Sequence, residues 1–217
     1  NGDIQAVFAA NDEMALGAME AISGASKDIL VMGFDATDDA IASIKEGKMA
    51  GTIAQQPALI GSTAVENAVK LMAGETIEKS IPVEVTLVTK DNVDSFGAAA
   101  PVEIVGNGSI GLSVSTQNNP FFVTLAEGAK AAADKAGVSL SVVDAGDDVT
   151  KQVSDIEDLV AKGVSVLIVN PCDSDAVTGA VEAAKAKGVK VISVDRAVNG
   201  VEIDCQIASD NVLGAEL

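Results

Sequence analysis

Apolar residues in the second half of the chain alternate between short Val- and Ile-rich runs and longer stretches with helical spacing. The short runs predict strands that begin near four positions: Ile110, Ser139, Ser165 and Lys190. Their spacing of about 25–30 residues leaves room for one helix between successive strands, as βαβ units require. A glycine is expected to end each helix, at Gly137, Gly163 and Gly188. The pattern therefore predicts repeated βα units.

The first half shows the same alternation. Strands are expected at four runs: Ala6–Phe8, Ile29–Met32, Gly51–Ala54 and Val83–Val88. Because the strands of both halves are apolar on both faces, we expect an α/β fold with parallel sheets covered by helices on both faces. A stretch rich in Gly and Ala, from Phe96 to Ser109, has no clear period and is interpreted as a linker between the halves.

Composition narrows the possible functions. The 217 residues are 48% hydrophobic, which is enough for a sizeable core in one or two domains. A net charge of −18 without a visible basic face argues against nucleic-acid partners, and the absence of histidine removes the commonest catalytic base and metal ligand. The apolar runs are too short to cross a membrane, and the first residues carry no signal-peptide pattern. Two isolated cysteines, Cys172 and Cys205, indicate neither a disulfide nor a metal site, and no cofactor is expected.

Polar residues follow six of the expected strands at the point where each strand ends. These exits are Asn11-Asp12, Phe34-Asp35, Ser115, Asp144, Asn170 and Asp195-Arg196. Ligands of open α/β sheets bind outside the carboxyl ends of the strands, so the exits predict a binding edge. Asp12 and Asp144 are interpreted as helix caps or turn formers, because Asp is a good N-cap residue.

Asp195 and Arg196 form the most specific exit. Arg196 is the only arginine among the 14 basic residues, and its planar guanidinium makes bidentate hydrogen bonds that lysine cannot reproduce. Together the two side chains offer donors and an acceptor, which suits the vicinal hydroxyls of a sugar. The alternative is a structural ion pair between them.

The segment Ser115–Phe122 follows an apolar strand and opens a helix. Asn119 suits the N-cap, and Pro120 suits the first helical position. Phe121 and Phe122 are about 100° apart on a helix, so we expect one ring to face the core and the other to face the mouth of the sheet, where it suits the apolar face of a sugar. The alternative is a capped helix with two core residues.

Seven segments carry the motifs of these exits: Phe8–Gly17, Gly33–Asp35, Thr52–Pro57, Ser115–Phe122, Asn170–Val177, Val194–Arg196 and Ile207–Asn211. They closely resemble the bacterial periplasmic ribose-binding proteins, the substrate-binding proteins of sugar ABC importers. The resemblance covers nearly everything except the linker. It implies two βα lobes joined by a hinge, with ribose or a similar monosaccharide held in the interlobe cleft and delivered to the membrane subunits of an importer. It also implies a periplasmic or other extracytoplasmic location.

The resemblance further implies the ligand contacts and the division of the chain. The first lobe would contribute Ser115, Asn119, Phe121, Phe122, Asp195 and Arg196, the second lobe Asn11, Phe34 and Asp35, and the hinge Gln55. The implied parts are a partial second lobe (1–52), the hinge (53–57), the first lobe (58–96 and 110–208), the linker (97–109) and a crossover or truncated helix (209–217).

Two departures from the family pattern change this expectation. The segment that resembles the family's carboxyl-terminal part comes first, as in a circular permutation, and the family's middle part has no counterpart. Because of the missing part, we expect only about half of the second lobe. Both ends of the chain also look cut, because the chain starts almost directly on a strand and stops at Leu217, inside an expected helix. An apolar strand edge exposed by the missing strands favours a homodimer.

Sugar binding with hinge closure is the leading hypothesis. One alternative is a rearranged or engineered binding-protein scaffold with weak or no sugar binding. Another is the effector-sensing domain of a lactose-repressor-type regulator, which shares the fold but needs a basic helix-turn-helix head that the sequence lacks. An enzyme is not expected, because the chain has no Ser–His or Cys–His arrangement and no Gly-rich phosphate-binding loop.

Overall fold

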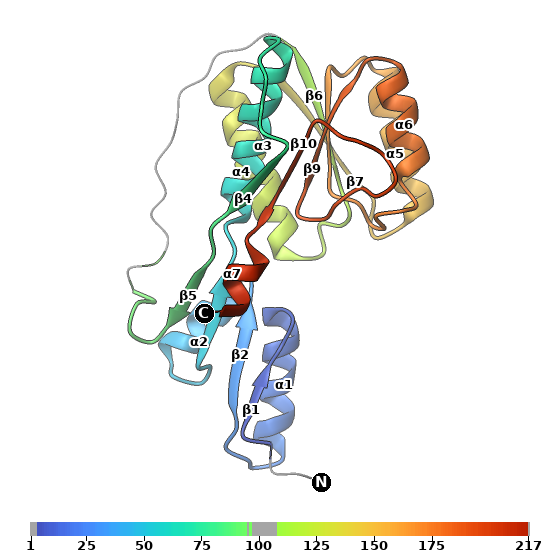
Figure 1. The fold of residues 1–217 in the computed structure, drawn as a ribbon. Helices are drawn as coiled ribbons and strands as arrows, with labels where there is room; N and C mark the ends of the chain where they lie inside the picture. Colours follow the sequence, from blue (N-terminus) through green and yellow to red (C-terminus); the bar gives the residue numbers. More distant parts are fainter. Residues whose placement is uncertain (1–3, 95, 97–107, 217) are drawn as a thin grey trace. The chain divides into compact units, whose positions relative to one another are not determined.

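The computed structural model describes residues 4–94, 96 and 108–216, so most of the expected linker (97–109) lies outside the described residues. The chain divides into two compact units, each with its own sheet (Figure 1). Of the described residues, the smaller unit comprises 4–56, 84–94, 96 and 210–216. The larger unit comprises the described residues 57–83 and 108–209.

The larger unit contains a six-stranded sheet in the order β4-β10-β9-β8-β6-β7. Its strands are β4 (Ser80–Val83), β6 (Ser109–Val114), β7 (Ser139–Asp144), β8 (Val166–Val169), β9 (Lys190–Val194) and β10 (Cys205–Ser209). All neighbouring strands are parallel, which confirms the predicted parallel arrangement in this unit. The carboxyl ends of β6, β8 and β9 therefore lie next to one another at one edge of the sheet.

Helices cover both faces of this sheet (Figure 1). They are α3 (Pro57–Met72), α4 (Pro120–Ala136), α5 (Val149–Ala161) and α6 (Thr178–Ala186). Within β8, Val166 and Ile168 pack in the core beside α3 and α4, whereas Leu167 and Val169 pack in the core beside α5 and α6. Burial on both faces explains why the strand reads as a continuous apolar run. The glycines predicted to end α4, α5 and α6 have the positive φ angles of left-handed helix ends: Gly137 (68°), Gly163 (81°) and Gly188 (83°).

The smaller unit contains a mixed sheet in the order β1-β2-β3-β5. Its elements are β1 (Ala6–Phe8), α1 (Asp12–Gly24), β2 (Leu30–Phe34), α2 (Asp38–Lys45), β3 (Gly51–Ala54), β5 (Thr86–Thr89) and α7 (Asn211–Glu216). The first three strands are parallel, whereas β5 runs antiparallel to β3, so the expectation of a purely parallel sheet fails at this strand. One core that includes Ala15, Val31, Ala40, Ile44 and Val88 joins α1 and α2 to one face of the sheet.

The opposite face of β1 and β2 carries exposed apolar side chains. Phe8 and Leu30 are 62% and 64% exposed, and β1 is the edge strand of the sheet. Farther along the same face, Gly214 of α7 lies close to Phe34 and Ile53. The apolar edge expected from the sequence therefore lies at β1.

The prediction of a single strand at Val83–Val88 is wrong. The structure has two strands here, and they belong to different sheets. Val83 of β4 pairs with Ser209, whereas Thr86 of β5 pairs with Ala54. Both strands share one alternating pattern of side chains, so local periodicity cannot reveal the change of sheet between them.

This change of sheet also alters the division of the chain. Residues 84–94 belong to the smaller unit, although the sequence assigns them to the first lobe with the rest of 58–96. The other boundaries fall after Gln56 and after Ser209, next to the expected hinge (53–57) and the expected crossover helix (209–217). The role of residues 53–57 as a hinge stays a prediction.

Candidate functional site

Three predicted strand exits meet at the carboxyl edge of the large sheet. Ser115 follows β6, Asn170 follows β8 and Asp195 follows β9. The Ser115 amide donates to Asn170 Oδ1 (3.2 Å), and Asn170 Nδ2 donates to Val194 O (3.2 Å) and to Asp195 Oδ2 (3.3 Å). The buried Asn170 amide therefore connects the three exits and orients the Asp195 carboxylate.

A buried glutamine that the sequence reasoning missed supports this connection. Gln152 of α5 is fully buried. Its Nε2 donates to Asn170 O (2.8 Å) and to Ser113 Oγ (3.2 Å), while its Oε1 accepts from the Cys172 amide (2.7 Å). Gln152 stands four residues before Ile156 on the apolar stripe of its helix, and a polar residue in such a stripe was the signal that could have revealed it.

The Arg196 guanidinium lies against three groups of the same edge. Its Nη1 donates to Pro171 O (3.1 Å), and its Nε lies 3.8 Å from Asp195 Oδ2, within ion-pair distance. Its Cζ lies 5.5 Å from the centroid of the Phe122 ring, a distance at which a cation is attracted to an aromatic face. The side chain remains 45% exposed, so the guanidinium is oriented and still accessible.

The Asp195 residue combines a mostly buried carboxyl group with a left-handed backbone conformation. Burial raises its pKa above the ordinary value of 3.8, while the Arg196 charge and the hydrogen bond from Asn170 act in the lowering direction. Its backbone has a φ of 64°, in the left-handed region that Asp tolerates better than most residues. The ion pair considered as the alternative role is present, and contact with a ligand stays a prediction.

The start of α4 has the predicted cap. Asn119 Oδ1 accepts a hydrogen bond from the Phe121 amide (2.8 Å), and Pro120 occupies the first helical position. The expectation that one of the two rings faces the mouth of the sheet is not met. Phe121 and Phe122 are 5% and 4% exposed and pack in the same core, edge to face, with their centroids 5.1 Å apart. Because α4 packs closely on α3 and the sheet, both rings are covered, and Phe122 is the one beside Arg196.

The smaller unit brings together a second set of predicted residues. Asn11 caps α1, since its Oδ1 accepts from the Met14 amide (2.9 Å). Asp35 Oδ1 accepts from Gln55 Nε2 (2.6 Å), which joins the exit of β2 to the residue that follows β3. Phe34 is half-buried at the end of β2. Two of the predicted contacts, Asp35 and Gln55, are therefore bonded to each other.

Asp12 and Asp144 differ in role. Asp144 Oδ1 accepts from the Gly146 amide (2.8 Å), which makes Asp144 the turn former that the sequence predicts. Asp12 is neither the cap of α1 nor a turn former of its own segment. Its carboxylate is fully buried and accepts hydrogen bonds from Thr37 and Thr52, so the predicted cap role is wrong.

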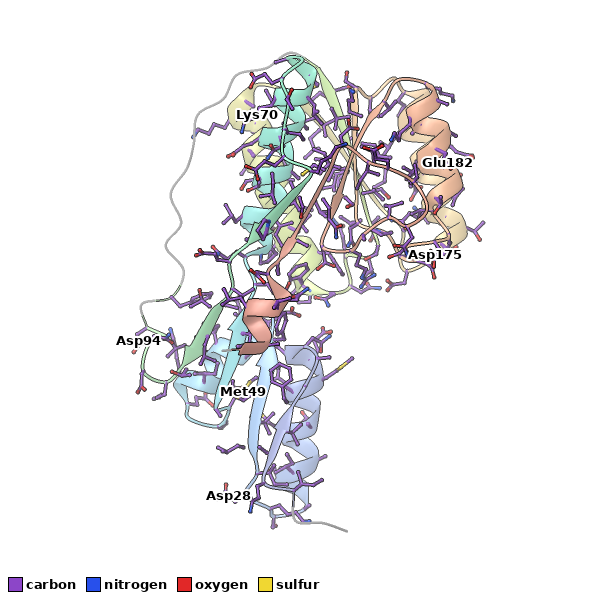
Figure 2. All side chains as sticks on the ribbon, viewed as in Figure 1. Asp28, Met49, Lys70, Asp94, Asp175 and Glu182 are labelled. Carbon is purple, nitrogen blue, oxygen red and sulfur yellow. The ribbon has the colours of Figure 1, made fainter. Side chains whose placement is uncertain are left out.

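The next features concern surface charge, possible metal ligands, the helices and one buried hydroxyl group. Acidic side chains such as Asp28, Asp94, Asp175 and Glu182 are exposed on the two units (Figure 2). Among residues 4–94, 96 and 108–216, no group of three or more His, Cys, Asp and Glu side chains is placed to hold a metal ion. None of the helices in these ranges combines the length and apolar composition that crossing a bilayer requires. Within the same ranges, the buried Ser115 Oγ has no hydrogen-bond partner.

The chain is similar to known proteins in both sequence and fold. Residues 1–76 and 110–217 match the family described as periplasmic binding protein domain. The ribose import binding protein of Bacillus subtilis is 50% identical over 109 residues, which cover 50% of this chain and 36% of the relative. That of Escherichia coli K12 is 40% identical over 131 residues, covering 60% and 44%. The chain thus spans less than half the length of these relatives. Among solved structures, the Caulobacter myo-inositol binding protein bound to myo-inositol has 34% identity and a TM-score of 0.47, covering 53% of this chain and 39% of that one.

Proposed function

This chain belongs to the periplasmic binding protein domain family, a family of binding proteins rather than enzymes, and on that premise we propose that it binds ribose or a similar monosaccharide. The prediction that it is not an enzyme is thereby confirmed by the family. Two similar proteins are ribose import binding proteins. The predicted contact residues also include hydrogen-bond donors and acceptors for sugar hydroxyls, and the half-buried Phe34 offers an apolar surface for a sugar ring face.

The observation that carries the proposal is the fixed geometry of Asp195 and Arg196. Asn170 orients the carboxylate, while Pro171 O and the Phe122 ring orient the guanidinium. A carboxylate and a guanidinium side by side suit two neighbouring hydroxyls, because one hydroxyl donates to the carboxylate and the next accepts from the guanidinium. Their orientation before binding lowers the entropic cost of holding the sugar.

The smaller unit supplies a second group of polar contacts in this proposal. Asp35 accepts hydrogen bonds from sugar hydroxyls, Asn11 and Gln55 provide amide groups, and Phe34 provides an apolar surface. Binding in an interlobe cleft, with hinge closure at residues 53–57, stays a prediction of the sequence. In such a mechanism the sugar favours the closed state only by the contacts that it gains there.

The transport context is also part of the proposal. Delivery of the sugar to the membrane subunits of an ABC importer, in the periplasm or another extracytoplasmic space, is supported by the family and by the similar ribose import proteins. The rotated order of the motifs supports a circular permutation: motifs near Asn11 and Asp35, which resemble the carboxyl-terminal part of the ribose-binding proteins, precede those near Phe122 and Arg196.

We also propose that the open face of the smaller unit, formed by β1 and β2 with Phe8 and Leu30, binds a second copy of the chain. Phe8 and Leu30 are largely exposed there, and the edge of β1 offers backbone groups for strand pairing. The two side chains are more exposed than a covered α/β sheet allows. A two-fold contact between identical faces would cover both.

A second candidate is a rearranged or engineered scaffold with weak or no sugar binding. The observation in its favour is that the chain spans only 36% of the Bacillus subtilis relative and 44% of the Escherichia coli relative. Contacts contributed by the uncovered part of those relatives would be lost in such a scaffold. The two candidates differ in one measurable property, the affinity for sugars.

Isothermal titration of the chain with ribose, other pentoses and hexoses tests the proposal. We expect ribose or a closely related sugar to bind with saturable heat, and Arg196→Ala to weaken that binding. Lys187→Ala, which removes one positive charge from an exposed position, serves as the matched control. A wild-type chain that is folded and binds none of the sugars would favour the scaffold.

A further inference from the structure

Asp12 is a strand-exit carboxylate that has no contact role in the proposed sugar site and does not form a turn within its own segment. Its Oδ2 accepts from the Thr37 amide (2.7 Å) and the Thr37 hydroxyl (3.3 Å). Its Oδ1 accepts from the Thr52 hydroxyl (2.7 Å). These bonds reach 25 and 40 residues along the chain. They connect the start of α1 to the turn after β2 and to β3.

The turn after β2 needs such support. Asp35 and Ala36 have φ angles of 118° and 62°, which side chains other than glycine rarely adopt. The Ala36 amide donates to Thr52 Oγ1 (3.3 Å), and the next residue, Thr37, caps α2 through its own hydroxyl. Conformations of this kind persist only where surrounding contacts determine them. Asp12 therefore holds the turn at two points: directly at Thr37, which follows the turn, and through Thr52 at Ala36, within the turn.

The approach of Asp12 to the turn also depends on the backbone of β2. A side chain at Gly33 would overlap the Asp12 carboxylate and the Met49 side chain. Burial raises the pKa of the Asp12 carboxyl, against the lowering effect of the hydrogen bonds from Thr52 and Thr37. A carboxylate kept at such a position despite unfavourable burial indicates a specific role in the local structure.

We propose that Asp12 is a positioning residue, which holds the left-handed turn at Asp35 and Ala36 and thereby aims the Asp35 carboxylate at Gln55. Asp35 Oδ1 accepts from Gln55 Nε2 (2.6 Å), so the direction of this side chain depends on the turn that Asp12 holds. Asp12 itself is buried and touches no ligand in this role. Its effect on sugar affinity rests on the proposed function, whereas its effect on the turn does not.

Amide hydrogen exchange by NMR on the full chain tests the effect on the turn. In Asp12→Asn, we expect the Thr37 and Ala36 amides to exchange at least about 10-fold faster than in the wild type, relative to the Ala9 amide. The Ala9 amide is the internal reference because it donates to Met32 O (2.9 Å) in the same sheet and reports opening of the β1–β2 pair away from the turn. Asp39→Asn is the matched control, since it removes an exposed carboxylate two residues beyond Thr37.

Substitutions at Thr52 test the same contact from the other side. Thr52→Val removes the hydroxyl with little change of shape and is expected to speed exchange at Ala36, whereas Thr52→Ser keeps the hydroxyl and is expected to restore slow exchange. If Asp12→Asn fails to fold, the two Thr52 variants decide whether the contact between Asp12 and Thr52 holds the turn. Proportional changes at Thr37, Ala36 and Ala9 would show general destabilisation and would overturn the proposal, as would unchanged exchange in a folded Asp12→Asn.

Sugar titration separates this proposal from the proposed function. If the wild type binds ribose, Asp12→Asn and Thr52→Val should weaken binding by about 10-fold or more, and Thr52→Ser and Asp39→Asn should not. Ribose binding unchanged in Asp12→Asn would show that Asp12 does not position the site. If the wild type binds no sugar, the proposed function fails, and the exchange rates alone decide whether Asp12 holds the turn.

Discussion

The guanidinium carbon of Arg196 lies 5.5 Å from the centre of the Phe122 ring. This contact joins the exit of β9 to the start of α4, two places that are more than 70 residues apart in the chain. The ring is buried in the core, while the guanidinium reaches the surface. Phe122 therefore contributes to the proposed site chiefly by supporting Arg196.

Removing the guanidinium should weaken sugar binding. A charge-assisted hydrogen bond contributes roughly 1.5–3 kcal/mol, so Arg196→Ala should raise the dissociation constant for ribose by about 10- to 100-fold. Arg196→Lys should recover little, because an ammonium group lacks the planar fork. Calorimetric titration checks both. Equal affinities for wild type and Arg196→Ala would remove Arg196 from the site.

Truncation of either aromatic ring should destabilise the larger unit. Phe121 and Phe122 are both buried, so each change to Ala should lower the free energy of unfolding by about 3–5 kcal/mol. Urea denaturation measures this cost. Phe122→Leu, which keeps most of the buried volume but loses the ring face, should retain more stability than Phe122→Ala and still weaken sugar binding. A Phe122→Leu protein with wild-type affinity would show that the ring does not orient Arg196.

The stability of the chain should depend on pH through Asp12. Its pKa in the folded state is raised above the ordinary value of 3.8, so the folded state holds this proton more tightly than the unfolded state. The associated stability is fully present below pH 3.8 and is lost as the pH rises through the raised pKa. Asn cannot ionise, so the stability of the wild type relative to Asp12→Asn should fall across that window. Urea denaturation of both proteins between pH 3.5 and about 7 checks this, and a difference that grows with pH would contradict it.

Self-association should depend on the open face of the smaller unit. We expect the wild type to form dimers in sedimentation experiments and Phe8→Ser to shift the equilibrium toward monomer. Because each copy carries a net charge of −18, salt should strengthen the association. Val142→Ser, at a 37% exposed position in β7 of the larger unit, is the control. A wild type that stays monomeric at high concentration would exclude this contact.

The sequence alone determined most of the helices and strands and the edge at which polar residues gather. Apolar periodicity marks the helices, and terminal glycines mark where α4, α5 and α6 end, because both signals arise within a few residues of the chain. The exits Ser115, Asn170 and Asp195 were predictable because parallel strands with βα connections place their carboxyl ends at one edge.

Only the tertiary structure decided which strands share a sheet and what each polar group contacts. The change of sheet between Val83 and Thr86 depends on partners more than 30 residues away, which the alternation of side chains does not encode. The buried bonds of Gln152 and Asp12 likewise join distant segments. Both rings of α4 are buried because α3 and the sheet cover them, and no local pattern specifies that cover. Local sequence fixes what a residue can do, whereas packing between distant segments decides which of these possibilities is used.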